Sequence, residues 1–164
     1  MIDKFTYDDL HHLAISRIAE YLTKYILTLK GLDVYTTEVD NKGIDFVIRN
    51  NQKKYFDIQV KSIRYPNTSY IFIKKEEEWK DNNLRANLIL ALVVFINNQS
   101  PEVYLIPSIS FKKETEILKN RKEYKVPEWG INYSKKNIKL FEPFLTKNST
   151  SQQGIIKKIF YASL

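Results

Sequence analysis

The run of consecutive apolar residues LILALVVFI, at positions 88–96, restricts the fold of this chain more than any other segment. A strand with one face in water alternates polar and apolar residues, whereas a strand covered on both faces is apolar at every position. The run is also far too short to cross a bilayer as a helix, which takes about 20 apolar residues. We therefore expect a buried central strand in a layered α/β domain, with no membrane-spanning segment.

The composition limits the chemistry that the chain can perform. Its 164 residues, 43% of them hydrophobic, suit one domain over 1–164, with a core region at about 10–107 and a basic part at 108–164. Cysteine is absent, and His11 and His12 are the only histidines. Disulfides, thiolate zinc sites and cysteine nucleophiles are thus excluded, and a divalent metal such as Mg²⁺ or Mn²⁺ would need oxygen ligands. The lack of cysteine and of an apolar signal segment in MIDKFTYDDL predicts a cytoplasmic protein.

The positive charge of the chain is concentrated in its C-terminal part. Residues 1–100 hold 14 Lys or Arg against 13 Asp or Glu, a balance of +1, and residues 101–164 hold 12 against 6, a balance of +6. A basic segment of this kind suits a polyanionic partner such as nucleic acid. A lysine-rich surface that binds nothing is the alternative.

Periodicity predicts a helix, then strands, then further helices. The helix covers residues 7–30, with Thr6 as its cap and Gly31 after its end. Strands are expected at 32–39, 43–49, 55–63, 69–74, 87–96 and 102–107, and an extended segment at 129–134. Short helices are expected at 74–85, 108–122, 135–145 and 154–164. This order predicts an α/β sandwich with a mixed sheet of about five strands.

Polar residues on two of these strands form the most informative pattern. The polar turn NNQKK joins the segments 43–49 and 55–63, which predicts a hairpin. Side chains alternate between the faces of a strand, so Gln59 and Lys61 share a face, and antiparallel pairing would bring Asp45 beside one of them. A carboxylate, an amide oxygen and an ammonium group would suit a hard metal ion. A metal-bound water and nearby positive charge are what phosphodiester hydrolysis requires.

At these residues the sequence resembles the PD-(D/E)xK nuclease superfamily, which has the restriction-endonuclease-like fold. The pattern of that superfamily is a helix with a Glu, a strand with an Asp, and a strand with Asp or Glu, one residue, and Lys. Glu20, Asp45 and the tripeptide Gln59-Val60-Lys61 match it in order over roughly residues 10–75, as do the phrases GID and IQVKS. Ile44 stands before Asp45 where the pattern has Pro, and Gln59 replaces the acidic residue, as it does in some members.

The resemblance implies a three-layer-like α/β/α core and a Mg²⁺- or Mn²⁺-dependent endonuclease that hydrolyses DNA. The implied catalytic residues are Asp45, Gln59, Lys61 and Glu20. The metal would be held by Asp45, Gln59, Glu20 and the carbonyl of Val60, while Lys61 would serve the attacking water. Cutting both strands of a duplex would suit a homodimer. The substitution at Gln59 leaves open an inactive nucleic-acid-binding or assembly module, and an α/β domain without a nucleic-acid partner is a third possibility.

Several of these polar residues also have a purely structural interpretation. Glu20 is spaced to form an ion pair with Lys24 one helical turn later. Asp57 either joins the site or sits at the mouth of the strand, and His11 and His12 are surface residues or substrate contacts. The aromatic residues that could stack on bases, or pack in the core, are Trp79, Trp129 and Tyr133.

Overall fold

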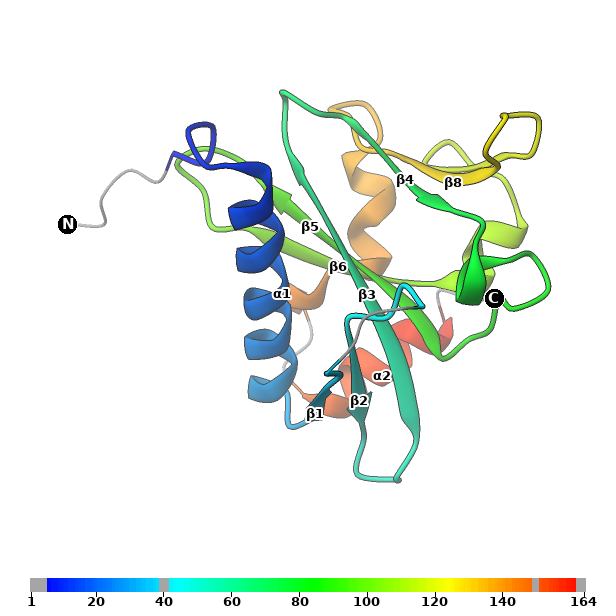
Figure 1. Cartoon of the computed structure of the whole chain (residues 1–164). Coiled ribbons are helices and arrows are strands. Elements are labelled where there is room, and N and C mark those ends of the chain that lie inside the picture. The colour runs from blue at the N-terminus through cyan, green and yellow to red at the C-terminus, as the bar shows by residue number, and fades with distance from the viewer. Residues whose placement is uncertain (1–5, 39–41, 149–150, 162–164) are drawn as a thin grey trace.

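The computed structural model describes residues 6–38, 42–148 and 151–161 (Figure 1). One sheet has the strand order β1-β2-β3-β5-β6 and a second has the order β4-β8-β7. The strands are β1 (Asp33–Thr36), β2 (Phe46–Arg49), β3 (Tyr55–Arg64), β4 (Tyr70–Lys74), β5 (Leu88–Phe95), β6 (Glu102–Pro107), β7 (Leu118–Arg121) and β8 (Glu128–Asn132). The helices are α1 (His12–Leu29) and α2 (Gln152–Tyr161), with 3₁₀-helices η1 (Glu77–Trp79), η2 (Ser108–Lys112), η3 (Ile138–Phe144) and η4 (Thr146–Asn148). The prediction of a mixed α/β fold with an N-terminal helix and a mixed sheet of five strands is confirmed.

Strand β5 is the central strand that its apolar run predicts, because all of its residues are buried. It pairs in parallel with β3 on one side and antiparallel with β6 on the other. The remaining pairs of this sheet, β1 with β2 and β2 with β3, are antiparallel. Strand β3 is therefore the point at which a hairpin joins the buried strand.

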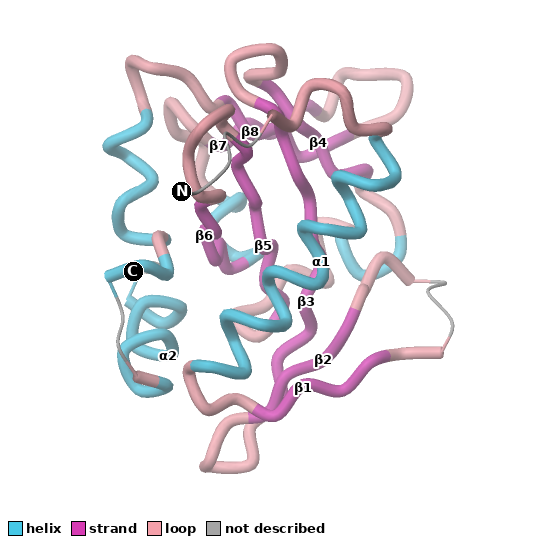
Figure 2. The backbone as a smooth tube through the Cα atoms, turned by 90° about the vertical axis from the view of Figure 1, so that its left-hand side faces the viewer, coloured by secondary structure: helices cyan, strands magenta, loops and turns pink. Residues whose placement is uncertain are grey.

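Helix α1 covers one face of the five-stranded sheet (Figure 2). Its buried residues Ile15, Ala19 and Leu27 belong to a cluster with Phe46 of β2 and Ile58 of β3. Alternate residues of β5 face this cluster, and those between them face a second cluster on the other side. The apolar face of α1 is thus matched to one face of the sheet, as helical spacing requires.

The opposite face is covered by the three-stranded sheet, and one of its strands, β7, lies where the sequence predicts a helix. The helix expected over 108–122 is wrong: η2 takes its first residues and β7 its last. Leu118 of β7 pairs with Ile131 of β8, and both side chains join Trp129 in the core on this face. Burial of these side chains against β5 outweighs the local helical pattern, since tertiary packing commonly overrides propensity.

The N-terminal helix begins later than its periodicity predicts. Its N-cap is His11, whose Nδ1 accepts a hydrogen bond from the Leu13 amide at 3.3 Å, so the cap assigned to Thr6 is wrong. Tyr7 and Asp8 are instead tied to the loop that follows β5: the Tyr7 amide donates to Asn97 Oδ1 at 2.8 Å, and Asn97 Nδ2 donates to Asp8 Oδ2 at 2.6 Å. Non-local hydrogen bonds of this kind cannot be read from helical spacing.

The other predicted segments agree with the structure to different degrees. Only η1 forms within 74–85 and only η3 within 135–145, both as 3₁₀-helices. Helix α2 supports the helical pattern of the C-terminal segment, of which residues 162–164 lie outside the described part. The strand expected at 32–39 is shorter, and its last position, residue 39, also lies outside the described part. The segments at 102–107 and 129–134 form β6 and β8.

A short turn fixes how β2 and β3 pair. Asn50 is 4% exposed, and its side-chain Oδ1 accepts a hydrogen bond from the Lys54 amide at 2.9 Å. Lys53 has a φ of 61°, in the left-handed region that tight turns use. The resulting register sets Phe46 opposite Ile58, which brings the residue before β2 level with the middle of β3.

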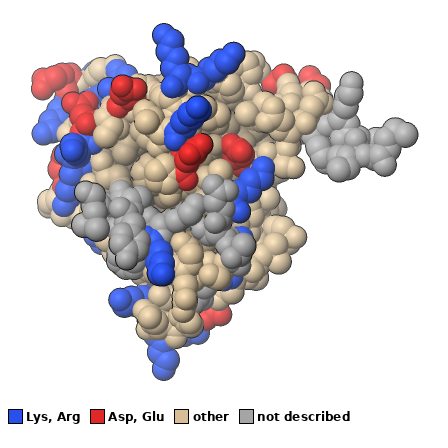
Figure 3. Space-filling view, turned by 180° about the vertical axis from the view of Figure 1, so that it is seen from behind, with Lys and Arg blue, Asp and Glu red and all other residues tan. Residues whose placement is uncertain are grey.

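No helix of the described residues is long and apolar enough to cross a membrane. On the face opposite the view of Figure 1, Lys and Arg side chains lie among Asp and Glu side chains (Figure 3). The positive charge on that face is therefore interrupted by negative charge, and the charge balance by itself does not define a binding surface there.

Candidate functional site

The candidate site lies where β2 and β3 separate. Strand β3 pairs with β2 only over Tyr55–Ile58 and with β5 over Asp57–Arg64, so its second half has a strand partner on one side among the described residues. Asp45, just before β2, lies at this separation, and its amide donates to the Ile58 carbonyl at 2.8 Å. Its side-chain Oδ2 accepts a hydrogen bond from the Val60 amide at 2.5 Å. The Asp45 carboxylate thus continues the hydrogen bonding along this edge of β3 past Phe46, the first residue of β2.

The backbone of Val60 faces the same edge as the Asp45 carboxylate. Within a strand, the N–H and C=O of one residue point to the same side, because residues of an antiparallel hydrogen-bonded pair exchange both bonds. The Val60 amide points at Asp45, so the Val60 carbonyl is directed to this edge as well. One carboxylate and one carbonyl oxygen therefore share the open edge of β3.

Glu20 reaches this edge from α1. Glu20, Asp45 and Val60 line one cavity of about 260 Å³, together with Leu13, Ser16 and Arg17 of the helix. Glu20 Oε1 also accepts a hydrogen bond from Lys24 Nζ at 2.6 Å. The structural interpretation of Glu20 as an ion-pair partner is thus confirmed, and the same side chain lies in one cavity with Asp45.

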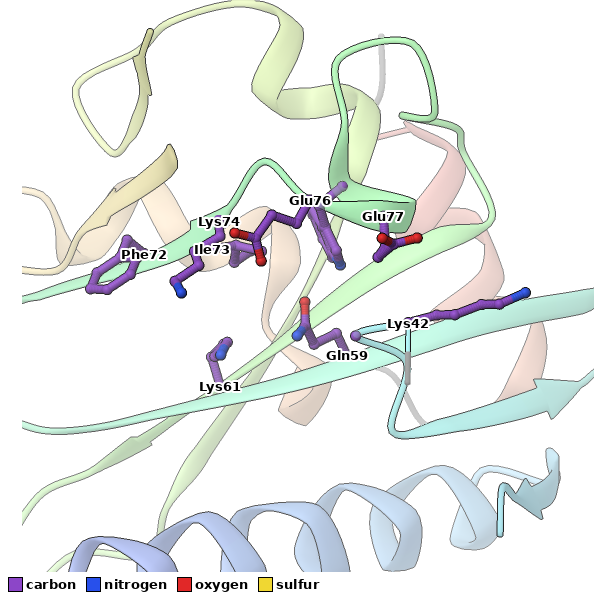
Figure 4. Close-up of a pocket in the computed structure, with 10 residues that line it drawn as sticks. Lys42, Gln59, Lys61, Phe72, Ile73, Lys74, Glu76 and Glu77 are labelled. Carbon is purple, nitrogen blue, oxygen red and sulfur yellow. The ribbon is translucent and has the colours of Figure 1, made fainter. Parts of the chain in front are cut away.

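Gln59 and Lys61 point to the other face of β3. They line a separate cavity of about 540 Å³ between β3 and the segment of β4 and η1. In Figure 4 both side chains extend away from β3 toward Glu76 and Lys74. The structure therefore brings Asp45, Glu20 and Val60 together, and Gln59 and Lys61 together, without joining the five side chains in one cavity.

A third hollow, of about 430 Å³, connects these two cavities along the edge of β3. It shares Ser16 and Val60 with the first cavity and Lys61 and Phe72 with the second. The three hollows therefore follow one another across the open edge of β3, from α1 to β4. We call this path the edge groove.

Asp57 takes no part in the groove. Its Oδ2 accepts a hydrogen bond from Arg85 Nη2 at 2.5 Å, and Arg85 Nη1 donates to Glu78 at 2.8 Å. Partial burial acts to lower the pKa of Arg85, but the hydrogen bonds that its guanidinium donates to the two carboxylates outweigh this effect, so the pKa is raised. The polar side chain of Asp57 on this central strand is thus explained by an ion-pair network.

The remaining candidates divide between surface and core. His11 caps α1, and its ring lies 4.2 Å from that of His12, on the exposed start of the helix. The three aromatic residues are at most 1% exposed, so they pack in the core and cannot stack on a base at the surface: Trp79, Trp129 and Tyr133.

The structure adds groove residues that sequence reasoning missed. Phe72 lines two of the hollows and is 44% exposed, and Lys74 lines the larger cavity from the same strand. Ser16 and Arg17 contribute from α1. A signal existed for Phe72, because in SYIFIK it alternates with Ile71 and Ile73 on the face that carries Lys74. A large aromatic side chain on the polar face of a strand is a reason to expect that it contacts a ligand or a partner.

Comparison of the chain with known protein families and with curated proteins found no match. Within residues 6–38, 42–148 and 151–161, no three His, Asp or Glu side chains gather in a way that could hold a metal ion. A metal at this edge would therefore depend on the two carboxylates and on backbone or amide oxygens.

Proposed function

We propose that this chain is a metal-dependent endonuclease with a restriction-endonuclease-like core, which hydrolyses phosphodiester bonds in DNA. The observation that supports this most is the Asp45 carboxylate at the separation of β2 and β3, in one cavity with Glu20 and beside the backbone of Val60. The resemblance to the PD-(D/E)xK pattern includes these three residues together with Gln59 and Lys61, which line the neighbouring cavity. Cutting both strands of a duplex requires two such sites, which a homodimer would supply.

The oxygen atoms at this edge fit a Mg²⁺ or Mn²⁺ ion. Mg²⁺ is commonly held by one or two carboxylates and the phosphates of its substrate, and it keeps several waters. Asp45, Glu20 and the Val60 carbonyl offer this kind of hard oxygen set. Gln59 faces the neighbouring cavity, so the proposed ligand set does not need it. A bound ion would supply a water of lowered pKa and a positive charge against the phosphate.

Lys61 is the residue that we assign to the phosphate. It lines both the larger cavity and the connecting hollow, and it makes no ion pair among the described residues. An ammonium group without a carboxylate partner can meet the charge that develops on the non-bridging oxygens or orient the attacking water. Asp45 keeps its carboxylate in place through the Val60 amide, which limits the reorganisation needed during the reaction.

Nicking of supercoiled plasmid DNA tests this proposal. With Mg²⁺ or Mn²⁺ we expect nicking by the purified chain, and with EDTA we expect none. Asp45→Asn and Lys61→Ala should each lower the rate by about 100-fold or more, the usual effect of removing one transition-state contact. Asp33→Asn is a matched control, because Asp33 lies exposed on β1 in an ion pair with Arg49, away from the groove. Nicking that survives both site variants would refute the proposal.

A nucleic-acid-binding or assembly module without catalysis is the second candidate. Gln59 in place of an acidic residue, and the lack of a third carboxylate in the described site, favour it. Salt-dependent binding of DNA together with no nicking in any metal would support this candidate over the nuclease.

A further inference from the structure

Two polar atoms on the residues that line the cavity of Gln59 and Lys61 have no hydrogen-bond partner among the described residues. These atoms are Gln59 Oε1 and Trp79 Nε1, both of which are buried. Trp79 is only 1% exposed. A buried donor or acceptor left unpaired is costly, and native structures rarely leave such groups without a partner of some kind. The wall of the cavity thus holds one acceptor and one donor that the described residues leave unpaired.

The two side chains come together at Gly43. A Cβ built on Gly43 would lie 3.3 Å from Gln59 Nε2 and 3.8 Å from Trp79 Cδ1, the ring atom bonded to Nε1. Gly43 has a φ of 69°, a backbone conformation that glycine adopts without strain. The glycine backbone therefore lies against both side chains, and it helps to hold the amide and the indole at one end of the cavity.

The rest of the cavity offers a ring surface and charges of both signs. Phe72 is 44% exposed at its rim, and in Figure 4 Phe72 and Lys74 lie on the strand across from Lys61. The volume of about 540 Å³ falls within the range of small-molecule pockets. The charged groups that line it are three lysines and two glutamates: Lys42, Lys61, Lys74, Glu76 and Glu77.

We propose that this cavity binds an unpaired nucleobase. The ring would stack on Phe72, its edge would accept from Trp79 Nε1–H and donate to Gln59 Oε1, and Lys61 or Lys74 would meet the adjoining phosphate. A planar ring with a donor and an acceptor on one edge, next to a phosphate, matches these groups together. A base inside a duplex is excluded from such a contact, because its pairing edge and both ring faces are already occupied.

This inference rests on the proposed function and narrows its substrate. The edge groove joins the cavity to Asp45 and Glu20 through Val60, so a base held there would belong to a nucleotide close to the scissile phosphate. The substrate is therefore a single strand, or a duplex with a nucleotide unpaired beside the cut. A free nucleotide carries the same base and phosphate, and it is the alternative source of this chemistry.

Equilibrium binding without metal separates base recognition from cleavage. In EDTA, fluorescence anisotropy would measure the Kd of the chain for two labelled single-stranded DNA oligomers of equal length. One oligomer carries bases, and the other has abasic residues with the same phosphates. We expect the chain to prefer the oligomer with bases. Phe72→Ala should weaken binding of that oligomer by about 5- to 140-fold, the effect of losing one stacked base, and leave the abasic oligomer almost unchanged.

Two further variants make the result specific. Trp79→Phe keeps an aromatic ring in the core and removes the indole donor together with part of the buried ring volume, so it should lower the preference for bases, and thermal unfolding on the same sample checks that the chain stays folded. Tyr35→Ala is the matched control, because Tyr35 is 43% exposed on β1, outside the groove, and its loss should change neither oligomer.

The outcomes distinguish the two proposals. Equal binding of both oligomers by the wild type, or equal effects of Phe72→Ala and Tyr35→Ala, would overturn the base pocket and leave the nicking result untouched. Preference for bases without nicking would support the pocket and refute the nuclease. Binding of a nucleoside monophosphate with a lower Kd than that of the oligomer with bases would assign the pocket to free nucleotides and overturn its place on a strand. Absence of binding by every probe would overturn the pocket.

Discussion

Replacement of Asp45 should separate its two roles, one in folding and one in the proposed chemistry. Asp45 Oδ2 accepts a hydrogen bond from the partly buried Val60 amide at 2.5 Å, and Asp45→Ala removes that acceptor. A hydrogen bond to a charged group contributes about 1.5–3 kcal/mol, and one between neutral groups about 0.5–1.5 kcal/mol. In a chain of this size each 1 kcal/mol shifts the melting temperature by about 2–4 °C. Asp45→Ala should therefore lower Tm by about 3–12 °C.

Asp45→Asn should behave differently, because the amide oxygen can still accept from Val60. Its Tm should fall by about half to two thirds as much as that of Asp45→Ala, because a neutral hydrogen bond replaces a charged one, while nicking should be lost in both variants. Circular dichroism during thermal unfolding and the plasmid assay, on the same samples, measure the two effects. Asp45→Ala melting at the wild-type temperature would show that the bond to Val60 contributes nothing. Asp45→Asn nicking at the wild-type rate would show that the charge of the carboxylate is not needed.

Three further predictions concern the rest of the molecule. Burial raises the pKa of Tyr104 above its ordinary value of 10.0, so the unfolded chain loses this proton first and the free energy of unfolding should fall as pH rises above about 10. In Tyr104→Phe the slope of that fall, measured by urea unfolding, should be smaller by about 1.4 kcal/mol per pH unit. A Cβ on Gly130 would lie 2.8 Å from Tyr70 Cε2, so Gly130→Ala should destabilise the chain by about 1–3 kcal/mol, and an unchanged Tm would contradict this packing. Binding of single-stranded DNA should weaken with salt, and Lys74→Ala should reduce the slope of log K against log salt by about 0.7; an unchanged slope would argue against a phosphate contact at Lys74.

The strands with strong local patterns could be predicted from the sequence. The apolar run of β5 gives its burial on both faces, and the alternation in β3 places Gln59 and Lys61 on one face, as the structure does. These features depend on residue spacing within one strand, which the pleat fixes. The hairpin of β2 and β3 was predictable for the same reason, with its turn residues as the second signal.

The layer opposite α1 could not be predicted in this way. Strand β7 forms because Leu118 pairs with Ile131 of β8, and the local sequence around Leu118 does not indicate that partner. The division of the site also depends on tertiary structure. The PD-(D/E)xK pattern groups Asp45 with both Gln59 and Glu20. Only the packing of α1 against one face of β3 decides that Glu20 and Asp45 share a cavity and that Gln59 faces another.

The length of the turn at 50–54 determines the geometry of the candidate site. This length fixes the register of β2 and β3, and the register aligns the Asp45 carboxylate with the backbone amide of Val60. The side chain of Val60 takes no part in that hydrogen bond. Exchange of Val60 for another apolar residue should therefore be tolerated far better than a single inserted residue in the turn. Such an insertion would slip the pairing by one position and exchange the faces of all β2 side chains. Substitution of side chains along the edge groove is thus compatible with this fold, whereas a change in the length of the turn at 50–54 is not.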